Sequence, residues 1–115
     1  MIISKGEERL LSLLRETFPF TRIIEQYYVY YAGQKLYFDF YLPAYSLVIE
    51  FQGNQHYEFV EFFHQDNDGW RLHKKRDMLK KDWVFENEMN LLEINDTNFP
   101  GDVNELLDIV INASK

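Results

Sequence analysis

Hydrophobic and polar residues follow two periodicities along the chain, one with helical spacing and one that alternates as in strands. Helical spacing is carried first by four leucines: Leu10, Leu11, Leu13 and Leu14. Ser4 precedes them and stands three positions before Glu7, which is the spacing of an N-terminal capping box. These features predict a first helix over residues 5–16, which ends before Phe18-Pro19 because proline disfavours a helical residue in front of it.

Three segments rich in β-branched and aromatic residues then predict three strands, over residues 22–31, 35–42 and 47–51. Short turns separate these segments, at Ala32-Gly33-Gln34 and at Pro43-Ala44-Tyr45. Consecutive strands joined by short turns form an antiparallel meander. The third segment is the most apolar, so we expect it to lie in the interior of the sheet.

The second half of the chain predicts two helices and one further strand. A helix over residues 69–88 is followed by a strand at 90–94 and by a last helix over 102–113. The last helix is expected to turn four apolar side chains inward: Val103, Leu106, Leu107 and Val110. Between the third strand and the long helix, a loop is expected from Gly53, and residues 57–66 show no clean period. The order α-β-β-β-α-β-α predicts an α+β fold, with helices covering a mixed sheet, in one domain.

Composition narrows the class of protein. Apolar residues make up 46% of the chain and aromatic residues 17%, which favours a folded domain over a disordered tail. No apolar run approaches the roughly 20 residues that span a bilayer. The first eight residues lack the pattern of a signal peptide, and the chain contains no cysteine. Disulfides, thiolate zinc sites and cysteine nucleophiles are therefore excluded, and we expect a soluble cytoplasmic protein without a membrane partner.

Charge is distributed unevenly along the chain. The formal net charge is −7, yet six of the twelve basic residues fall within eleven positions: Arg71, Lys74, Lys75, Arg76, Lys80 and Lys81. Such a run is most often a solvated helix face. A basic strip on an acidic body can also meet a phosphate backbone. The candidate contacts to nucleic acid are Arg71, Lys74, Lys75, Arg76 and Lys80.

Two acidic residues are expected on one face of the sheet. Because side chains alternate along a strand, Asp39 and Glu50 can come together from adjacent strands. Two neighbouring carboxylates repel unless one is protonated or a cation lies between them, and oxygen ligands suit Mg²⁺ or Mn²⁺. Acids on a half-exposed sheet are more often simply solvated. Glu50, however, interrupts the most apolar strand, where a lone carboxylate is unfavourable.

The sequence around these acids resembles a nuclease superfamily. Asp39, followed after ten residues by Glu50-Phe51-Gln52, resembles the D…(D/E)-x-K signature of the PD-(D/E)XK nucleases. The predicted α-β-β-β-α-β order is similar to their restriction-endonuclease-like core, here with an extra C-terminal helix. Segments 38–43, 49–57 and 76–83 resemble more closely the branch of very-short-patch-repair-like and phage homing endonucleases. The resemblance covers nearly the whole chain.

This resemblance implies a role for each matching residue. It implies metal binding by Asp39 and Glu50, an acid on the first helix that reaches the metal through water, and a histidine that transfers a proton or stabilises the phosphate. The catalytic set that it implies is Glu7, Asp39, Glu50, Gln52, His56, Asp77 and Lys81. Plainer interpretations stay open. Glu7 also fits the capping box, and His56 also fits a loop position without a function. Asp77 and Lys81, four residues apart on a helix, also fit a simple ion pair.

Gln52 departs from the signature, which has lysine at that position. Glutamine can orient a water or a phosphate oxygen, but it brings no positive charge. Lys80 or Lys81 on the facing helix, or His56, would have to compensate. The expected activity is hydrolysis of phosphodiester bonds in DNA by an in-line attack of a metal-activated water.

Two other classes of function stay open at this point. One is a nuclease-fold module that binds DNA or protein without cleaving, which Gln52 and the acidic charge favour. The other is an interaction domain whose contact surface is made of tyrosines: Tyr27, Tyr28, Tyr30, Tyr31, Tyr37 and Tyr41. For a nuclease of this length, specificity would need a homodimer, a partner, or loops such as 53–68.

Overall fold

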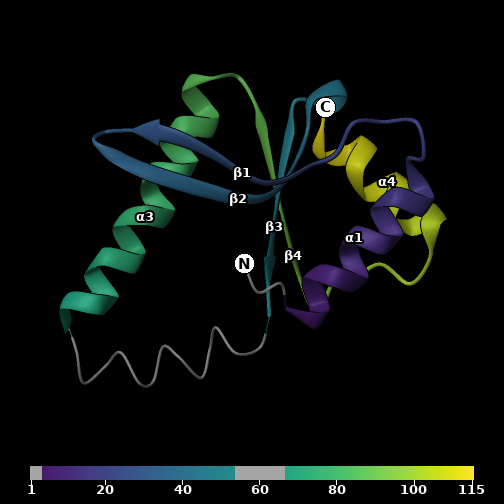
Figure 1. The fold of residues 1–115 in the computed structure, drawn as a ribbon, viewed down its shortest axis with the longest axis horizontal. Helices are drawn as coiled ribbons and strands as arrows, with labels where there is room; N and C mark the ends of the chain where they lie inside the picture. The colour runs from purple at the N-terminus through teal and green to yellow at the C-terminus, as the bar shows by residue number, and fades with distance from the viewer. Residues whose placement is uncertain (1–3, 54–66) are drawn as a thin grey trace.

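The structure, a computed structural model, describes residues 4–53 and 67–115 (Figure 1). Over these ranges the chain forms an α+β domain with a four-stranded mixed sheet, three α-helices and one short 3-10 helix. The elements are α1 (Lys5–Thr17), β1 (Ile24–Tyr31), β2 (Gln34–Leu42), η1 (Pro43–Tyr45), β3 (Leu47–Gln52), α3 (Asn67–Glu86), β4 (Asn90–Asn95) and α4 (Val103–Ala113). The predicted order of elements is therefore confirmed for the described part of the chain.

The sheet has the order β1-β2-β3-β4. The first three strands form the predicted antiparallel meander, while β4 pairs with β3 in parallel. The apolar strand β3 lies between β2 and β4, in the interior position expected from its composition. A parallel neighbour requires a long crossover connection, and α3 belongs to that connection.

The helices cover both sides of the sheet, as Figure 1 shows: α1 and α4 lie on one side of β3 and β4, and α3 lies on the other. Each side has its own core. We call the first the α1/α4 core; its buried residues include Leu10, Leu14, Leu42, Leu47, Ile49, Leu106 and Val110. We call the second the α3 core; its buried residues are Leu36, Phe38, Val48, Trp83 and Val84.

The capping box at the start of α1 is confirmed in part. The Ser4 hydroxyl accepts a hydrogen bond from the Glu7 backbone N–H at 3.2 Å, so Ser4 is the N-cap. The Glu7 side chain lies on the same side of the helix as buried Leu10 and Leu14 and is itself half-buried. Glu7 is therefore directed towards the sheet, as its helical position predicts.

The hairpin formed by β1 and β2 twists strongly halfway along its length. β3 pairs only with residues 40–42 of β2, and beyond them the hairpin continues alone across α3 (Figure 1). Phe38 belongs to the α3 core and Phe40 to the α1/α4 core, although both lie on the same side of an alternating strand. Asp39 lies between them, at the point where β2 leaves β3. Opposite Asp39 in the register, Gln26 has a positive φ of 49°, a conformation that is rare within a strand.

A few sequence-based expectations need correction. The first strand begins at Ile24 rather than residue 22, and the long helix covers Asn67–Glu86 rather than 69–88. Leu107 is 36% exposed instead of inward, because Leu106 and Val110 already fill the contact of α4 with the sheet and α1. In the part of the chain that is described, no helix is both long and apolar enough to cross a membrane.

Candidate functional site

The site is built where β2 separates from β3. At this point the ladder between the two strands ends, and the Phe51 backbone N–H of β3 donates a hydrogen bond to Asp39 Oδ2 at 2.7 Å. The carboxylate thus replaces the strand partner that β2 no longer supplies, which satisfies a polar group that would otherwise be unpaired. This bond orients Asp39 against β3, next to Glu50.

Glu50 is a mostly buried acid that faces α3. Its side chain is only 16% exposed, and Lys80 Nζ donates a hydrogen bond to Glu50 Oε1 at 2.5 Å. Burial raises the pKa of Glu50 to about 7, although the charge and the hydrogen bond of Lys80 act in the opposite direction. The negative charges of Asp39 and Asp77 raise this pKa further. Asp39 and Glu50 therefore share one electrostatic environment, as the strand periodicity predicts.

A pocket of about 210 Å³ opens between β3, β4 and α3 beside Glu50. Its lining consists of Glu50, Gln52, Asp77, Lys80, Lys81, Leu91 and Glu93. Four residues of the catalytic set implied by the resemblance are among them, two from β3 and two from α3. The pocket thus combines a buried carboxylate, an amide and two lysines on facing walls, a composition that suits a cation together with an anion.

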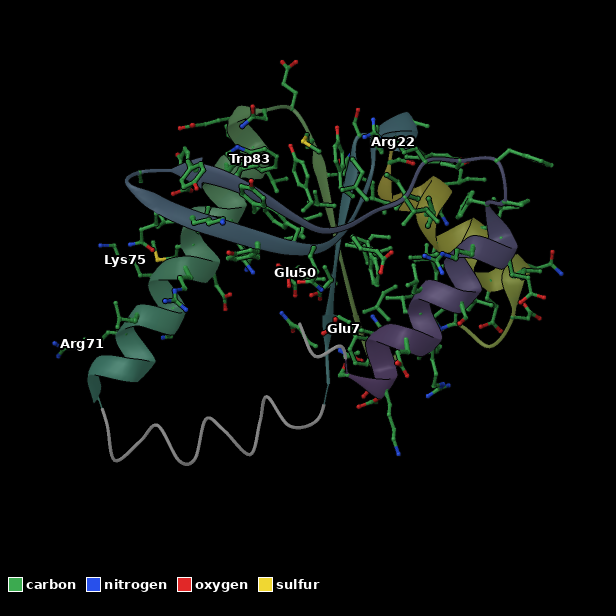
Figure 2. All side chains as sticks on the ribbon, in the orientation of Figure 1. Glu7, Arg22, Glu50, Arg71, Lys75 and Trp83 are labelled. Atoms are coloured by element: carbon green, nitrogen blue, oxygen red, sulfur yellow. The ribbon has the colours of Figure 1, made fainter. Side chains whose placement is uncertain are left out.

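Glu7 lies on the other helix that approaches this region. Figure 2 shows Glu50 between β3 and α3, and Glu7 at the beginning of α1 beside the same strand. Gln26 Nε2 donates a hydrogen bond to Glu7 Oε2 at 3.4 Å. Burial raises the pKa of Glu7, and the charge of Asp39 raises it further. Glu7 and Asp39 are therefore close enough for their charges to interact.

Glycine is needed next to Glu7 for α1 to approach the sheet this closely. A Cβ placed on Gly6 would overlap the ring of Phe51, which packs against Phe99 with ring centroids 6.2 Å apart. The first turn of α1 consequently lies against the end of β3. This close approach helps to place Glu7 in the same region as the acids of the sheet.

The donor atoms fit a hard divalent cation, but the acids do not form a complete ligand cage. Within residues 4–53 and 67–115, no group of three or more His, Asp or Glu side chains is positioned to hold a metal ion. Mg²⁺ needs no such cage, because it retains several waters and is commonly bound through one or two carboxylates. Asp39 and Glu50 could hold the ion in that manner, with Lys80 displaced from Glu50.

The basic residues of α3 do not form one continuous face. Arg71 and Lys75 point away from Glu50, as Figure 2 shows, whereas Lys80 points to it. Arg76 is one helical turn before Lys80 and shares its side of the helix. Of the predicted nucleic-acid contacts, the structure thus brings Lys80 to the pocket and leaves Arg71 and Lys75 on the opposite side of α3; Lys74 is exposed.

The six-tyrosine contact surface considered from the sequence is divided by the hairpin. Tyr27, Tyr31 and Tyr41 pack against the α3 core, and Tyr27 stacks on Tyr41 with ring centroids 4.5 Å apart. The exposed members are Tyr28, Tyr30 and Tyr37, gathered around Lys35. Alternation accounts for the division within β1, because consecutive tyrosines point to opposite faces. In β2, Tyr37 and Tyr41 have the same parity and are separated by the twist at Asp39.

Sequence reasoning missed several members of the site. Glu93 is the register partner of Glu50 in β4 and lines the same pocket. Its signal was available, since it too is an acid within an apolar strand. Gln26 had no comparable signal, because its hydrogen bond to Glu7 depends on the strand distortion. His56 lies outside the described residues, so its predicted role stays a prediction.

Comparison with known proteins finds short regions of similarity to two viral proteins. The chain is 36% identical over 56 residues to Uncharacterized protein 307L of Invertebrate iridescent virus 6, which covers 49% of this chain and 28% of the viral protein. It is 36% identical over 62 residues to Uncharacterized protein 033L of Invertebrate iridescent virus 3, which covers 54% of this chain and 32% of that protein. The chain thus matches less than a third of either relative. No protein-family model and no solved structure matches it.

Proposed function

We propose that the protein is a metal-dependent endonuclease that hydrolyses phosphodiester bonds in DNA. One observation carries this proposal: the largely buried acid Glu50 lines a pocket with Lys80 and Lys81, and the charge of Asp39 acts on it. A buried acid beside a second acid favours a bound cation, and lysines on the facing wall favour an anion. A divalent ion would balance the charge of the acids, and a phosphodiester would balance the charge of the lysines.

Each residue of the site has a chemical task in this proposal. Mg²⁺ or Mn²⁺ supplies a water of lowered pKa and offsets charge on the phosphoryl oxygens. Asp39, oriented by the Phe51 N–H, and Glu50 hold the ion. The Gln52 amide orients a water or a phosphate oxygen, and the lysines of α3 bind the negatively charged phosphate.

The fold supports the proposed membership of the PD-(D/E)XK superfamily. The element order and the mixed sheet, with β4 parallel to β3, agree with the restriction-endonuclease-like core that the resemblance implies. The polar pocket lies between β3, β4 and α3, next to the point where β2 diverges from β3. A shared fold does not establish a shared activity, so the site residues carry the argument.

Plasmid cleavage tests the proposal. Purified protein with supercoiled plasmid and Mg²⁺ or Mn²⁺ is expected to give nicked or linear DNA, and Asp39→Ala or a chelator is expected to abolish the product. Asp108→Ala on the exposed side of α4 is a matched control and is expected to cleave like the wild type. Equal cleavage by wild type and Asp39→Ala would show that a contaminant or another site is responsible.

One observation favours a second function, a nuclease-fold module that binds DNA or protein without cleaving it. Lys80 forms an ion pair with Glu50 and so neutralises this acid without a metal ion. In that case DNA binding would be independent of divalent ions and no cleavage would occur. A salt titration of DNA binding with and without Mg²⁺ separates the two functions. Phosphate contacts weaken steeply with salt in either case, but only the nuclease responds to Mg²⁺.

A further inference from the structure

We propose that Lys80 is the positively charged group that faces the phosphate in this pocket, and that it and the divalent cation compete for Glu50. The inference rests on the proposed nuclease function. It goes beyond that function because it assigns the positive charge that faces the phosphate to a specific residue of α3, whereas β3 offers only the neutral Gln52. Three features of the structure support it: the fixation of the Lys80 side chain, the charge of the site, and the shared contact with Glu50.

The ammonium group of Lys80 is held in place more firmly than that of its neighbour. The Lys80 side chain is only 20% exposed, donates to Glu50 Oε1, and lies 5.6 Å from the ring centroid of Phe38. Lys81 also lines the pocket, but it is exposed. The low exposure and the contact with Phe38 restrict this side chain apart from its bond to Glu50, and a restricted lysine loses less conformational entropy when it binds a phosphate.

The charge of the site favours a lysine at this position. Around the pocket, the described residues supply four carboxylates, those of Asp39, Glu50, Asp77 and Glu93, against the ammonium groups of Lys80 and Lys81. With all groups ionised, a divalent cation makes the site neutral. Without Lys80 the same site would keep one net negative charge and repel a phosphodiester.

The contact with Glu50 gives Lys80 two opposing effects. While Lys80 is bonded to Glu50, its charge and its position disfavour a metal ion on the same carboxylate. Once the ion is on Glu50, the ammonium group is released towards the pocket, where Gln52 lies on the facing strand. Removal of Lys80 should therefore weaken cleavage and strengthen metal binding, two changes that a purely structural role would not produce together.

The experiment measures both quantities in the same variants. Lys80→Met is expected to lower the rate of Mn²⁺-dependent plasmid cleavage on the order of 10²-fold, because it removes a positioned charge from the site. Calorimetric titration with Mn²⁺ alone is expected to show binding about fivefold tighter than in the wild type. Lys35→Met is the matched control, since Lys35 also contacts aromatic rings but lies on the hairpin between Tyr28, Tyr30 and Tyr37. It is expected to change neither quantity.

Lys80→Arg keeps the test decisive if Lys80→Met folds poorly, and a double variant tests the role of the charge when Lys80→Met folds well. Lys80→Arg retains the charge and is expected to keep at least about a tenth of the wild-type cleavage rate. The double variant Gln52→Lys with Lys80→Met moves the positive charge across the pocket. It is expected to cleave about tenfold faster than Lys80→Met alone.

The outcomes separate this inference from the proposed function. Cleavage by Lys80→Met at the rate of Lys35→Met, in a wild type that does cleave, would overturn the role of Lys80 and leave the nuclease intact. Loss of cleavage together with loss of Mn²⁺ binding would reduce Lys80 to a structural residue and also overturn the inference. A wild type that neither binds Mn²⁺ nor cleaves would overturn both proposals.

Discussion

The two faces of β3 meet opposite environments although their residues alternate along only six positions. On one face Leu47 and Ile49 are fully buried in the α1/α4 core, with Phe51 packed beside them. On the other face Val48 is buried in the α3 core, but the next position outward is Glu50. One face is apolar along the whole strand, whereas the other changes from apolar Val48 to charged Glu50, two residues further along.

The charged end of β3 is expected to add little to the stability of the fold. Burial raises the pKa of Glu50, so the site destabilises the ionised form of this acid. A largely buried ion pair such as that of Glu50 and Lys80 contributes little to stability compared with apolar side chains of similar size. The stability of the fold is therefore expected to come mainly from the two apolar cores.

The largest expected effect separates function from folding. Glu50→Gln keeps the size and a hydrogen-bond acceptor for Lys80 but removes the charge, so DNA cleavage with Mn²⁺ is expected to fall on the order of 10³-fold. Circular dichroism and thermal unfolding should show a folded protein. Glu25→Gln, on the exposed part of β1, serves as the control and should cleave normally. Unchanged cleavage in Glu50→Gln would contradict the assignment of the charged face.

A mutation of the apolar face should do the reverse. Leu14 is fully buried in the α1/α4 core, and Leu14→Ala is expected to lower the free energy of unfolding by about 3–4 kcal/mol, since it removes apolar contacts and leaves a cavity. At temperatures well below its unfolding transition the variant should cleave within about twofold of the wild type. Urea unfolding and cleavage rates check both parts, and a folded but inactive variant would show that the two faces are not independent.

The pH dependence of stability should follow Glu50. Its pKa is about 7 in the folded protein and near the ordinary 4.5 in the unfolded chain. Between these values the folded state holds more protons, so the stabilisation present below pH 4.5 is lost as the pH rises through 7. The free energy of unfolding should fall by about 2 kcal/mol across this window, after allowance for residual exposure.

Urea unfolding in chelator at pH 5 and pH 7.5 measures this change. Glu50→Gln carries no titrating group at this position and should lose the corresponding part of the slope. A slope of equal size in both proteins would assign the pH dependence to other groups.

The smallest effect is expected at the surface. Arg15 of α1 and Glu25 of β1 form a 3.1 Å ion pair whose side chains are 64% and 37% exposed. Arg15→Ala should lower the free energy of unfolding by less than about 1 kcal/mol, because solvent and salt screen exposed pairs. A loss as large as that of Leu14→Ala would show that this contact between α1 and the sheet matters far more than its exposure indicates.

Local features of the fold could be read from the sequence because each has a local physical cause. Ser4 caps α1 through its hydroxyl. The predicted turn at Ala32-Gly33-Gln34 is present, but it is a two-residue turn with positive φ at Ala32 and Gly33, and Gln34 already belongs to β2. The apolar composition of β3 correctly predicted its interior position. The α+β class followed from the order of these elements.

The long-range features could not be read in the same way. Alternation predicted one common face for Phe38 and Phe40, yet the twist at Asp39 sends them to different cores. The contact of Lys80 with Glu50 depends on how α3 is placed over the sheet, which no spacing along the chain specifies. Lys80 was expected as one basic residue of the strip and as one of three candidates, with Lys81 and His56, to compensate for Gln52. Glu93 offered a signal as an acid within an apolar strand, but its place opposite Glu50 depends on the register of the parallel strand β4, which is not encoded locally.

The most direct measurement of the central claim is the position of a bound Mn²⁺ ion. Crystals grown or soaked with Mn²⁺ give an anomalous difference map in which the ion is located independently of any assumption about the site. The account predicts a peak between the carboxyl groups of Asp39 and Glu50, with Lys80 moved away from Glu50. A peak on the other side of the sheet, or none at Mn²⁺ concentrations that support DNA cleavage, would contradict it.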